Sequence, residues 1–374
     1  MIAIPNHHFF QWVNQLKESG YEVYWFDVTD GGNKVERIDW VHQIKGWKLK
    51  FDFPLRHFLK KNFPRIYEGI QKYNERKITT IFTKLINEIK PDIVHCFEMK
   101  LAGLPILPVM KHNKIPFVYS SWGSDMYAYQ NLGISRNQAK LFLNRVDYLI
   151  TDCNRDFQIA QHLGFTNQFL GIFPGNGGIE IETTLIRPIN NRKTICIKGY
   201  DDSVGKALLV IKAIESIQFD SSIDFLIFSA DENVALYLNK SDYFKQRKVE
   251  IISRNSFIAN KLLLQKLGSC LLYIGNSISD GMPNSLLEAM GMGVFPIQSN
   301  PGKVSEEVIT HGVNGFLIEN PLDIHEIAGW IEKALLNNQL REEAQTDNIN
   351  LVSKNYNREN LKQDIVQLYK GILS

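Results

Sequence analysis

The sequence predicts an α/β protein with two doubly wound parallel sheets that face each other across a cleft. Three observations lead to this fold class. The chain has 374 residues, about the length of two ordinary domains. Strand-like apolar runs alternate with amphipathic segments of helical length, a pattern typical of parallel sheets covered by helices. The segment FPGNGGIE, residues 173–180, separates two such series and is rich enough in Gly and Pro to be a linker.

The two series of strands define the expected domains. After a short first strand and a first helix at residues 11–20, the first half offers strands at residues 21–28, 91–97, 116–122, 146–153 and near 168–172. The second half offers residues 194–199, 223–230, 248–253, 270–275, 294–299 and 315–319. We therefore expect an N-terminal domain over residues 1–172, a C-terminal domain over residues 173–355, and a helix over residues 356–374 that packs back toward the N-terminal domain.

The composition is that of a soluble globular protein, with 44% hydrophobic and 22% charged residues. The sequence contains no apolar run of about 18 residues, and its start lacks the features of a signal peptide, so we expect a cytoplasmic protein. The widely spaced cysteines fit neither a zinc site nor a disulfide framework and are expected to be buried thiols. They are Cys96, Cys153, Cys196 and Cys270.

The stretch SISDGMPNSLLEAMGMGVFPIQS, residues 277–299, combines groups that suit a nucleotide sugar. A helix is expected to begin near Pro283 or Asn284, and the amides and positive dipole at a helix start favour an anion. Asp280 precedes this helix and Glu288 lies one turn into it. Two acids that flank an anion site match the two sugars and the diphosphate of such a ligand. The alternative for each residue is a capped helix with a solvated Glu.

The same stretch resembles the donor-binding signature of retaining GT-B glycosyltransferases of family 4, also called group 1. In that signature an acid, Gly, any residue and Pro are followed by Glu eight positions after the acid, the spacing of Asp280 and Glu288. The segments EAMGMGVFPIQSNPG and THGVNGFLIE also resemble the family. The resemblance implies that Asp280 holds the donor sugar at the catalytic centre and that Glu288 binds the ribose. The other positions that it implies at the donor are Gly281, Met282, Pro283, Asn284, Ser285 and Leu286.

The segment TICIKGYDDSVGKALLVIKAI resembles the part of the family in which a Gly-Arg pair is followed by a Lys about six residues later. Lys206 matches that Lys, which implies a catalytic contact with the diphosphate; a solvated lysine is the alternative. Tyr200 stands where the family has Arg, so one phosphate contact is altered. Lys198 or Arg254 could replace the missing charge.

In the first half, SSWGSDMYAY at residues 120–129 resembles the His-Gly-x-Asp loop of the family, with Trp122 in place of His and Asp125 as the acid. Trp122 is a candidate to stack on a sugar on the acceptor side, or a core residue, and Asp125 is a catalytic candidate. His7 and His8 follow the first strand. Either could bind the donor phosphate or orient the acceptor hydroxyl, His8 as a catalytic residue and His7 on the acceptor side. The alternative for each is a structural or surface role.

Two further segments complete the sequence prediction. Asn176, Gly177 and Gly178 resemble the Pro-Asn-Gly segment of the family, whose small residues let two domains close, and Gly177 is also a donor-binding candidate. Residues 46–77 carry nine Lys and Arg against three Asp and Glu, with aromatic residues between them. This basic segment suits an anionic membrane surface on the inner face of the cell membrane, or is a solvated helix. No recognition motif for nucleic acid accompanies the charge.

The resemblance implies a retaining glycosyltransferase of the hexosyltransferase type that moves a sugar from a nucleotide sugar to a saccharide or lipid-linked acceptor in cell-surface polysaccharide biosynthesis. We expect no cofactor and no metal, since the sequence has no clear Asp-x-Asp motif and Asp201 and Asp202 are adjacent. Two alternatives stay open, a nucleotide-sugar epimerase on the same fold and a catalytically silent binding or scaffold protein. A dehydrogenase is disfavoured because no strand precedes a Gly-x-Gly-x-x-Gly turn.

Overall fold

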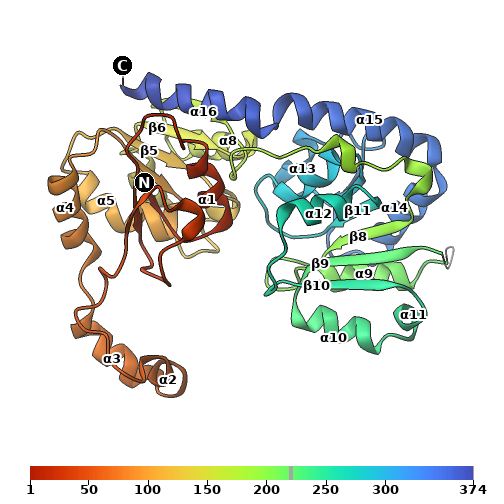
Figure 1. Cartoon of the computed structure of the whole chain (residues 1–374), viewed down its shortest axis with the longest axis horizontal. Helices are drawn as coiled ribbons and strands as arrows, with labels where there is room; N and C mark the ends of the chain where they lie inside the picture. Colours follow the sequence, from red (N-terminus) through yellow and green to blue (C-terminus); the bar gives the residue numbers. More distant parts are fainter. Residues whose placement is uncertain (219–221, 374) are drawn as a thin grey trace. The chain divides into compact units, whose positions relative to one another are not determined.

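The computed structural model describes residues 1–218 and 222–373, and the chain divides into two compact units (Figure 1). The chain passes from the first unit to the second between Gly177 and Gly178, inside the segment predicted as a linker. Both glycines have positive φ, and a Cβ on Gly178 would lie 2.7 Å from the Cα of Arg358, so glycine is required there. Of the described residues, the first unit comprises 1–151, 157–177 and 362–373, and the second comprises 152–156, 178–218 and 222–361.

The first unit is built on a parallel sheet of seven strands in the order β3-β2-β1-β4-β5-β6-β7. The strands expected from apolar runs are all present, which confirms the predicted parallel α/β fold of this half. One short edge strand, β3, was not predicted, because its three residues are only partly buried or exposed and show no apolar run. The strands are β1 (Ile2–Ala3), β2 (Tyr24–Asp27), β3 (His42–Ile44), β4 (Val94–Phe97), β5 (Phe117–Ser120), β6 (Tyr148–Thr151) and β7 (Gln168–Ile172).

Helices accompany this sheet, and the last helix of the chain contributes to its core. Tyr369 accepts a hydrogen bond from Trp12 Nε1 at 3.1 Å and lies 2.7 Å from Nδ1 of the buried His95. The first helix begins at His7, four residues earlier than predicted, because Asn6 caps it by accepting from the amide of Phe9 at 2.9 Å. The helices are α1 (His7–Asn14), α2 (Arg56–Asn62), α3 (Pro64–Asn74), α4 (Ile78–Ile89), α5 (Leu104–Met110), α6 (Ser124–Tyr127), α7 (Arg136–Leu143), α8 (Asn154–His162) and α16 (Arg358–Leu373), with short turns at Glu36–Ile38 and Met99–Gly103.

The second unit repeats the scheme with a parallel sheet of six strands in the order β10-β9-β8-β11-β12-β13. Its strands coincide with the apolar runs of the sequence to within a residue or two. They are β8 (Thr194–Lys198), β9 (Asp224–Ala230), β10 (Val249–Ser253), β11 (Cys270–Gly275), β12 (Phe295–Ser299) and β13 (Phe316–Ile318). The helices are α9 (Ala207–Glu215), α10 (Glu232–Lys240), α11 (Asp242–Lys245), α12 (Asn260–Leu267), α13 (Asn284–Gly291), α14 (Ile324–Leu336) and α15 (Asn338–Asn355), with turns at Thr183–Leu185, Ile189–Asn191, Pro301–Lys303 and Ser305–Glu307.

In each sheet the strand order reverses once, between β1 and β4 in the first unit and between β8 and β11 in the second. Loops that leave the carboxyl ends of the two strands at such a point diverge, which is where open α/β sheets bind ligands. We therefore expect ligand-binding residues after β1 and β4 in the first unit, and after β8 and β11 in the second. All four cysteines are buried free thiols, as predicted. Among the described residues, no helix is both long and apolar enough to cross a membrane.

Gly199, the residue after β8, lies very close to the end of the neighbouring strand β9. A Cβ on Gly199 would lie 2.6 Å from the Cα of Ala230, so Gly199→Ala should lower the free energy of unfolding by about 1–3 kcal/mol in urea titrations, as overpacking does. Gly329→Ala is the control, because its position is helical and exposed with no atom within 4 Å of the new Cβ. It should leave stability unchanged or raise it. Equal effects of the two substitutions would contradict the packing argument.

Candidate functional site

The loops after β8 and β11 are hydrogen-bonded to each other at the switch point of the second sheet. The amide of Lys206 donates to the carbonyl of Asn276 at 2.9 Å, and the amide of Ile278 donates to the carbonyl of Val204 at 3.1 Å. Gly205 lies where these loops meet, and a Cβ there would be 2.4 Å from the carbonyl oxygen of Tyr200. The two loops that carry most of the predicted donor residues therefore form one rigid edge.

Lys198 and Asp280 form an ion pair across this edge. Lys198 is the last residue of β8, and its Nζ lies 3.5 Å from Oδ2 of Asp280. Both side chains are partly buried. Burial opposes protonation of Lys198, but the charge of Asp280 outweighs it, and the pKa of Lys198 lies above its ordinary value. The backbone of Asp280 is also fixed, because Arg155 donates to its carbonyl at 2.8 Å.

Helix α13 begins at Asn284 and has Pro283 as its N-cap, as the sequence predicted. Proline has no side-chain group that can cap the helix, so the amides of the first turn face the loop without a side-chain acceptor from that residue. The hydroxyl of Ser285 lies 2.9 Å from that of Tyr273 in β11. The start of the helix thus combines amides, a serine hydroxyl and the positive end of a helix dipole.

Glu288 lies one turn into α13 and is partly buried. Burial raises the pKa of its carboxyl, although Asn260, which donates to Oε1 at 2.8 Å, acts in the opposite direction. Met282 and Leu286 have side chains in the hydrophobic core, and the amide of Leu286 donates to the carbonyl of Pro283 at 3.0 Å. The expectation that Leu286 offers a group to a diphosphate finds no support in this geometry, whereas Met282 and the buried Gly281 could contribute backbone groups.

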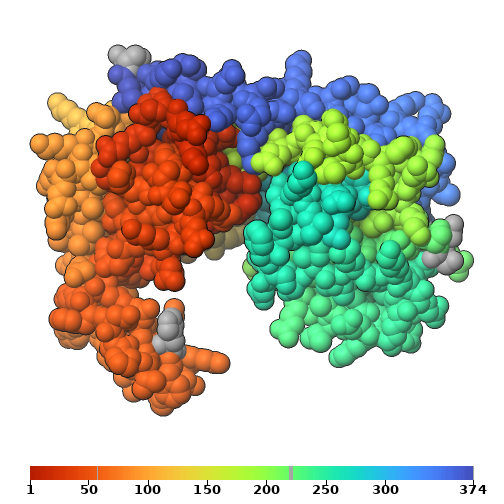
Figure 2. Space-filling model, viewed as in Figure 1, coloured from red at the N-terminus to blue at the C-terminus, as the bar shows by residue number. Residues whose placement is uncertain are grey.

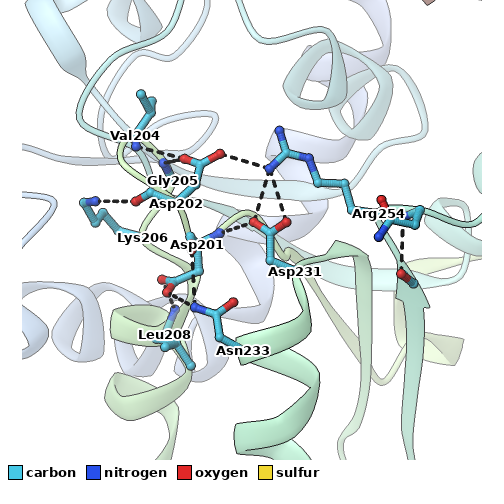
Figure 3. A network of polar contacts seen from close by, with 11 residues as sticks. Asp201, Asp202, Val204, Gly205, Lys206, Leu208, Asp231, Asn233 and Arg254 are labelled. Atoms are coloured by element: carbon cyan, nitrogen blue, oxygen red, sulfur yellow. Dashed lines mark hydrogen bonds and ion pairs between the residues drawn. The ribbon is translucent and has the colours of Figure 1, made fainter. Parts of the chain in front are cut away.

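Tyr200, which replaces the family arginine, lies beneath two cations. The guanidinium carbon of Arg254 is 4.0 Å from the centre of the Tyr200 ring and Nζ of Lys198 is 5.0 Å from it. Figure 3 shows that Arg254 also bridges Asp202, at 2.9 Å, and Asp231, at 3.2 Å. The structure therefore brings together both residues that were named as substitutes for the missing charge.

Asp202 organises the loop before α9 (Figure 3). Burial opposes its ionisation, but the amides of Gly205 and Val204 and the charge of Arg254 lower its pKa to about 2. Lys206 lies at the end of this loop, and its Nζ donates to the carbonyls of Asp202, at 2.9 Å, and Ser203, at 3.2 Å. Within the described part of the chain, no carboxylate forms an ion pair with Lys206, so its charge is not neutralised locally.

In the first unit, His8 and Trp122 lie close together beyond the carboxyl ends of β1 and β5. Their ring centres are 6.3 Å apart, and His7 adjoins His8 at 6.4 Å. Nδ1 of His7 also lies 2.9 Å from the guanidinium of Arg37. Trp122 packs against Phe97 with ring centres 5.2 Å apart. Its side chain is only partly buried, so part of it remains accessible to solvent.

Asp125 is buried beneath this cluster. Its carboxylate accepts hydrogen bonds from the amide of Trp122 at 2.9 Å, the amide of Met99 at 2.8 Å and the hydroxyl of Tyr119 at 2.6 Å. This geometry favours a role in fixing the loop of Trp122 over contact with a substrate. Gly177 is fixed in a related way, since Gln15 donates to its carbonyl at 2.5 Å.

Three residues near these sites were not identified as candidates from the sequence. Arg155 binds the carbonyls of Asp280 and Pro301 as well as the carboxylate of Asp156. Asn260 holds Glu288, and Glu98, which follows β4, has a φ of 76° and accepts from two amides of the next turn. A non-glycine residue with positive φ at a switch point is a recognised mark of functional sites. No local pattern in the sequence distinguishes these residues.

Comparisons with known proteins agree with this architecture. A family model described as "Glycosyl transferases group 1" matches residues 188–350, and one described as "Glycosyl transferase 4-like" matches residues 2–153. A comparison with curated proteins gives no match.

Several solved structures share the fold at low sequence identity. A sucrose-phosphate synthase from Thermosynechococcus elongatus has a TM-score of 0.73 at 14% identity, with 99% of this chain and 98% of that chain covered. A glycosyltransferase from Rickettsia africae has a TM-score of 0.67 at 15% identity, with 98% and 94% covered. HepE from Anabaena, solved with UDP and glucose, has a TM-score of 0.65 at 14% identity, with 98% and 96% covered.

The ion pair between Lys198 and Asp280 yields a second prediction. Lys198→Met and Asp280→Asn should each lower the free energy of unfolding by about 1–2 kcal/mol, because each leaves a partly buried charge without its partner. The double variant should lose about 1 kcal/mol less than the sum of the two. Lys245 and Asp242, an exposed pair at 2.8 Å, provide the control and should show no measurable coupling in the same urea titrations. If the losses of unfolding free energy at Lys198 and Asp280 were additive, the two side chains would not interact, which would contradict the ion pair.

Proposed function

Since the chain belongs to the group 1 glycosyltransferases of the GT-B, family 4 type, we propose that it moves a sugar from a nucleotide-sugar donor to a saccharide or lipid-linked saccharide, with retention of anomeric configuration. The observation that carries this proposal is the arrangement around α13. Asp280 lies before the helix, Glu288 lies one turn inside it, and the first-turn amides lie between them. The likeness to a fold solved with UDP and glucose supports a UDP-sugar as the first donor to test.

Each part of the donor has a partner in this arrangement. The hydroxyls of the transferred sugar would donate to Asp280, and the ribose hydroxyls would donate to Glu288. The diphosphate would lie at the start of α13, where amides, Ser285 and the uncompensated charge of Lys206 favour an anion. Because charge develops on the diphosphate as the bond to the sugar breaks, these groups stabilise the transition state more than the ground state.

The proposed retaining reaction needs no protein nucleophile. The acceptor hydroxyl would attack the anomeric carbon on the face from which the diphosphate leaves. The bond between the sugar and the diphosphate breaks, the glycosidic bond forms, and the proton of the hydroxyl passes to the leaving phosphate oxygen. His8 and Trp122 are our candidates to orient the acceptor, the first as a hydrogen-bonding group and the second as a surface for a sugar face.

The proposed reaction also requires no metal and no cofactor, and the state of the acidic residues supports this. Asp201 accepts from the amide of Leu208 and from Asn233, and Asp202 binds Arg254, so both carboxylates already hold the loop. Among the described residues, Asp152, Cys153 and Asp156 place possible ligand atoms near one another, but Asp156 is already ion-paired with Arg155 at 2.8 Å.

We further propose a role in cell-surface polysaccharide or glycan biosynthesis, at the inner face of the cell membrane. The support is the basic segment at residues 46–77, which would bring the enzyme to a lipid-linked acceptor.

Incubation with a panel of nucleotide sugars and saccharide acceptors, in excess EDTA, tests the proposal. We expect nucleoside diphosphate release only when acceptor is present, with the anomeric configuration of the product read by NMR. Lys206→Gln should lower kcat by about 100-fold or more while leaving the melting temperature nearly unchanged, since this side chain binds only carbonyls of its own loop. The control is Lys212→Gln, an exposed position on α9, the helix that follows Lys206.

Three outcomes would contradict the proposal in different ways. Isomerised nucleotide sugar without acceptor would indicate an epimerase, and binding without turnover would indicate a silent binding protein. An inverted product would overturn the retaining mechanism alone.

The raised pKa of Glu288 yields a prediction about pH. Only the ionised carboxylate accepts from both ribose hydroxyls, so donor affinity should be full above this pKa and should fall as the pH is lowered through it. Since burial raises the pKa, the fall should begin above the range of an ordinary glutamate. Calorimetric titration with an intact nucleotide sugar between pH 8 and pH 4.5 measures it. Glu288→Gln should bind more weakly and lose this dependence; a variant that keeps the same profile would refute the assignment.

A further inference from the structure

The basic segment of the first unit forms a helical hairpin carried on a two-stranded stalk. The amide of Lys50 donates to the carbonyl of Asn74 at 2.8 Å, and the amide of Arg76 donates to that of Lys48 at 2.7 Å. Trp47 anchors the stalk, because it is buried in the core and donates through Nε1 to the carbonyl of Asp27 at 2.7 Å. Figure 1 draws α2 and α3 at the far end of this stalk, where each packs mainly against the other.

The helical hairpin, residues 51–74, exposes large apolar side chains that the fold leaves uncovered. On α3, Ile66, Ile70 and Tyr73 are spaced by four and three residues and form one stripe, with Tyr73 77% exposed. A contiguous apolar surface of this kind marks an interaction site. The exposed apolar residues of the hairpin are Phe51, Leu55, Phe58, Phe63, Ile66, Ile70 and Tyr73. In the space-filling view the hairpin is a separate lobe of the first unit (Figure 2).

The same hairpin has a positive surface. Residues 46–77 carry nine Lys and Arg against three Asp and Glu, an excess of six positive charges. Two of the acids form ion pairs within the segment, Asp52 with Arg56 at 3.6 Å and Glu75 with Lys48 at 3.5 Å. Within the described part of the chain, four exposed cations of the helices form no ion pair. They are Lys60, Lys61, Arg65 and Lys72.

We propose that the helical hairpin docks on an anionic phospholipid bilayer, with its apolar side chains in the interfacial region and its cations at the headgroups. Both properties are needed for this, since apolar residues supply insertion and Lys and Arg supply attraction to anionic lipid. A second copy of the chain fits less well, because two copies of residues 46–77, each with an excess of six positive charges, repel each other. A nucleic acid would leave the exposed apolar stripe in water. The docking rests on the hairpin alone, and only its link to a lipid-linked acceptor rests on the proposed function.

Flotation of the full chain with vesicles tests the proposal, without any donor or acceptor. We expect binding to vesicles of phosphatidylcholine with about 30% phosphatidylglycerol, at least ~10-fold weaker binding to phosphatidylcholine alone, and a comparable loss in 0.5 M salt. Equal binding to both vesicles, or no binding to either, would overturn it.

Two sets of variants separate the charge from the apolar surface. The substitutions Lys60→Gln, Lys61→Gln, Arg65→Gln and Lys72→Gln together should abolish the preference for anionic lipid. The substitutions Ile66→Ser, Ile70→Ser and Tyr73→Ser together should weaken binding at all salt concentrations. The matched controls are Lys111→Gln, Lys240→Gln, Lys354→Gln and Lys370→Gln for charge, and Leu236→Ser with Leu336→Ser for apolar surface, all exposed positions outside the hairpin.

Two further readouts distinguish the possible failures. Both hairpin variants should keep the circular dichroism spectrum and the nucleotide-sugar affinity of the parent, because no donor residue lies in the hairpin. Controls that lose as much vesicle binding as the hairpin variants would overturn the proposal, as would a dimer in light scattering that only the apolar variant dissociates. A chain that binds vesicles but transfers no sugar would refute the proposed function and leave the docking surface intact.

Discussion

The hydrogen bonds between the loop after β8 and the loop after β11 are the constraint on which the candidate donor site depends. The strand order reverses between these strands, so their loops would otherwise diverge. The amides of Lys206 and Ile278 join the two loops, and Gly205 allows the close contact because it has no Cβ. As a result, Lys198 at the end of β8 meets Asp280, and α13 begins beside both. A site assembled from two such loops is preorganised, so little free energy is spent on ordering it when a ligand binds.

Much of the fold could be predicted from periodicity, because buried parallel strands are continuous apolar runs. The strands that were found this way, such as β8, β9 and β11, are buried along most of their length. β3 is an exposed edge strand, and the stalk of the hairpin is held by backbone hydrogen bonds and a few polar side chains such as Asn74, which leave no apolar pattern. Elements that are stabilised by hydrogen bonds at the surface are therefore the ones that sequence patterns miss.

The site was predictable where its residues are neighbours in sequence. Asp280 and Glu288 lie on one loop and the helix that it leads into, so their spacing carries the information. The contacts of Arg155 with Asp280, and of Arg254 with Tyr200, join residues 125 and 54 positions apart. Only the fold brings such residues together, and one sequence contains no periodic signal for them. The buried hydrogen bonds of Asp125 are equally invisible in sequence, although they decide whether the carboxylate faces a substrate or a loop.

The replacement of the family arginine by Tyr200 redistributes positive charge without removing it. Arg254 and Lys198 both lie over the ring, but each is already balanced by carboxylates, Arg254 by Asp202 and Asp231 and Lys198 by Asp280. Lys206 has no such partner within the described residues, so it supplies the main uncompensated charge for an anion. If sugar hydroxyls donate hydrogen bonds to Asp280, its carboxylate neutralises the charge of Lys198 less completely. Lys198 then becomes a second cation for the diphosphate. In that arrangement, recognition of the sugar would strengthen the site that stabilises the leaving group.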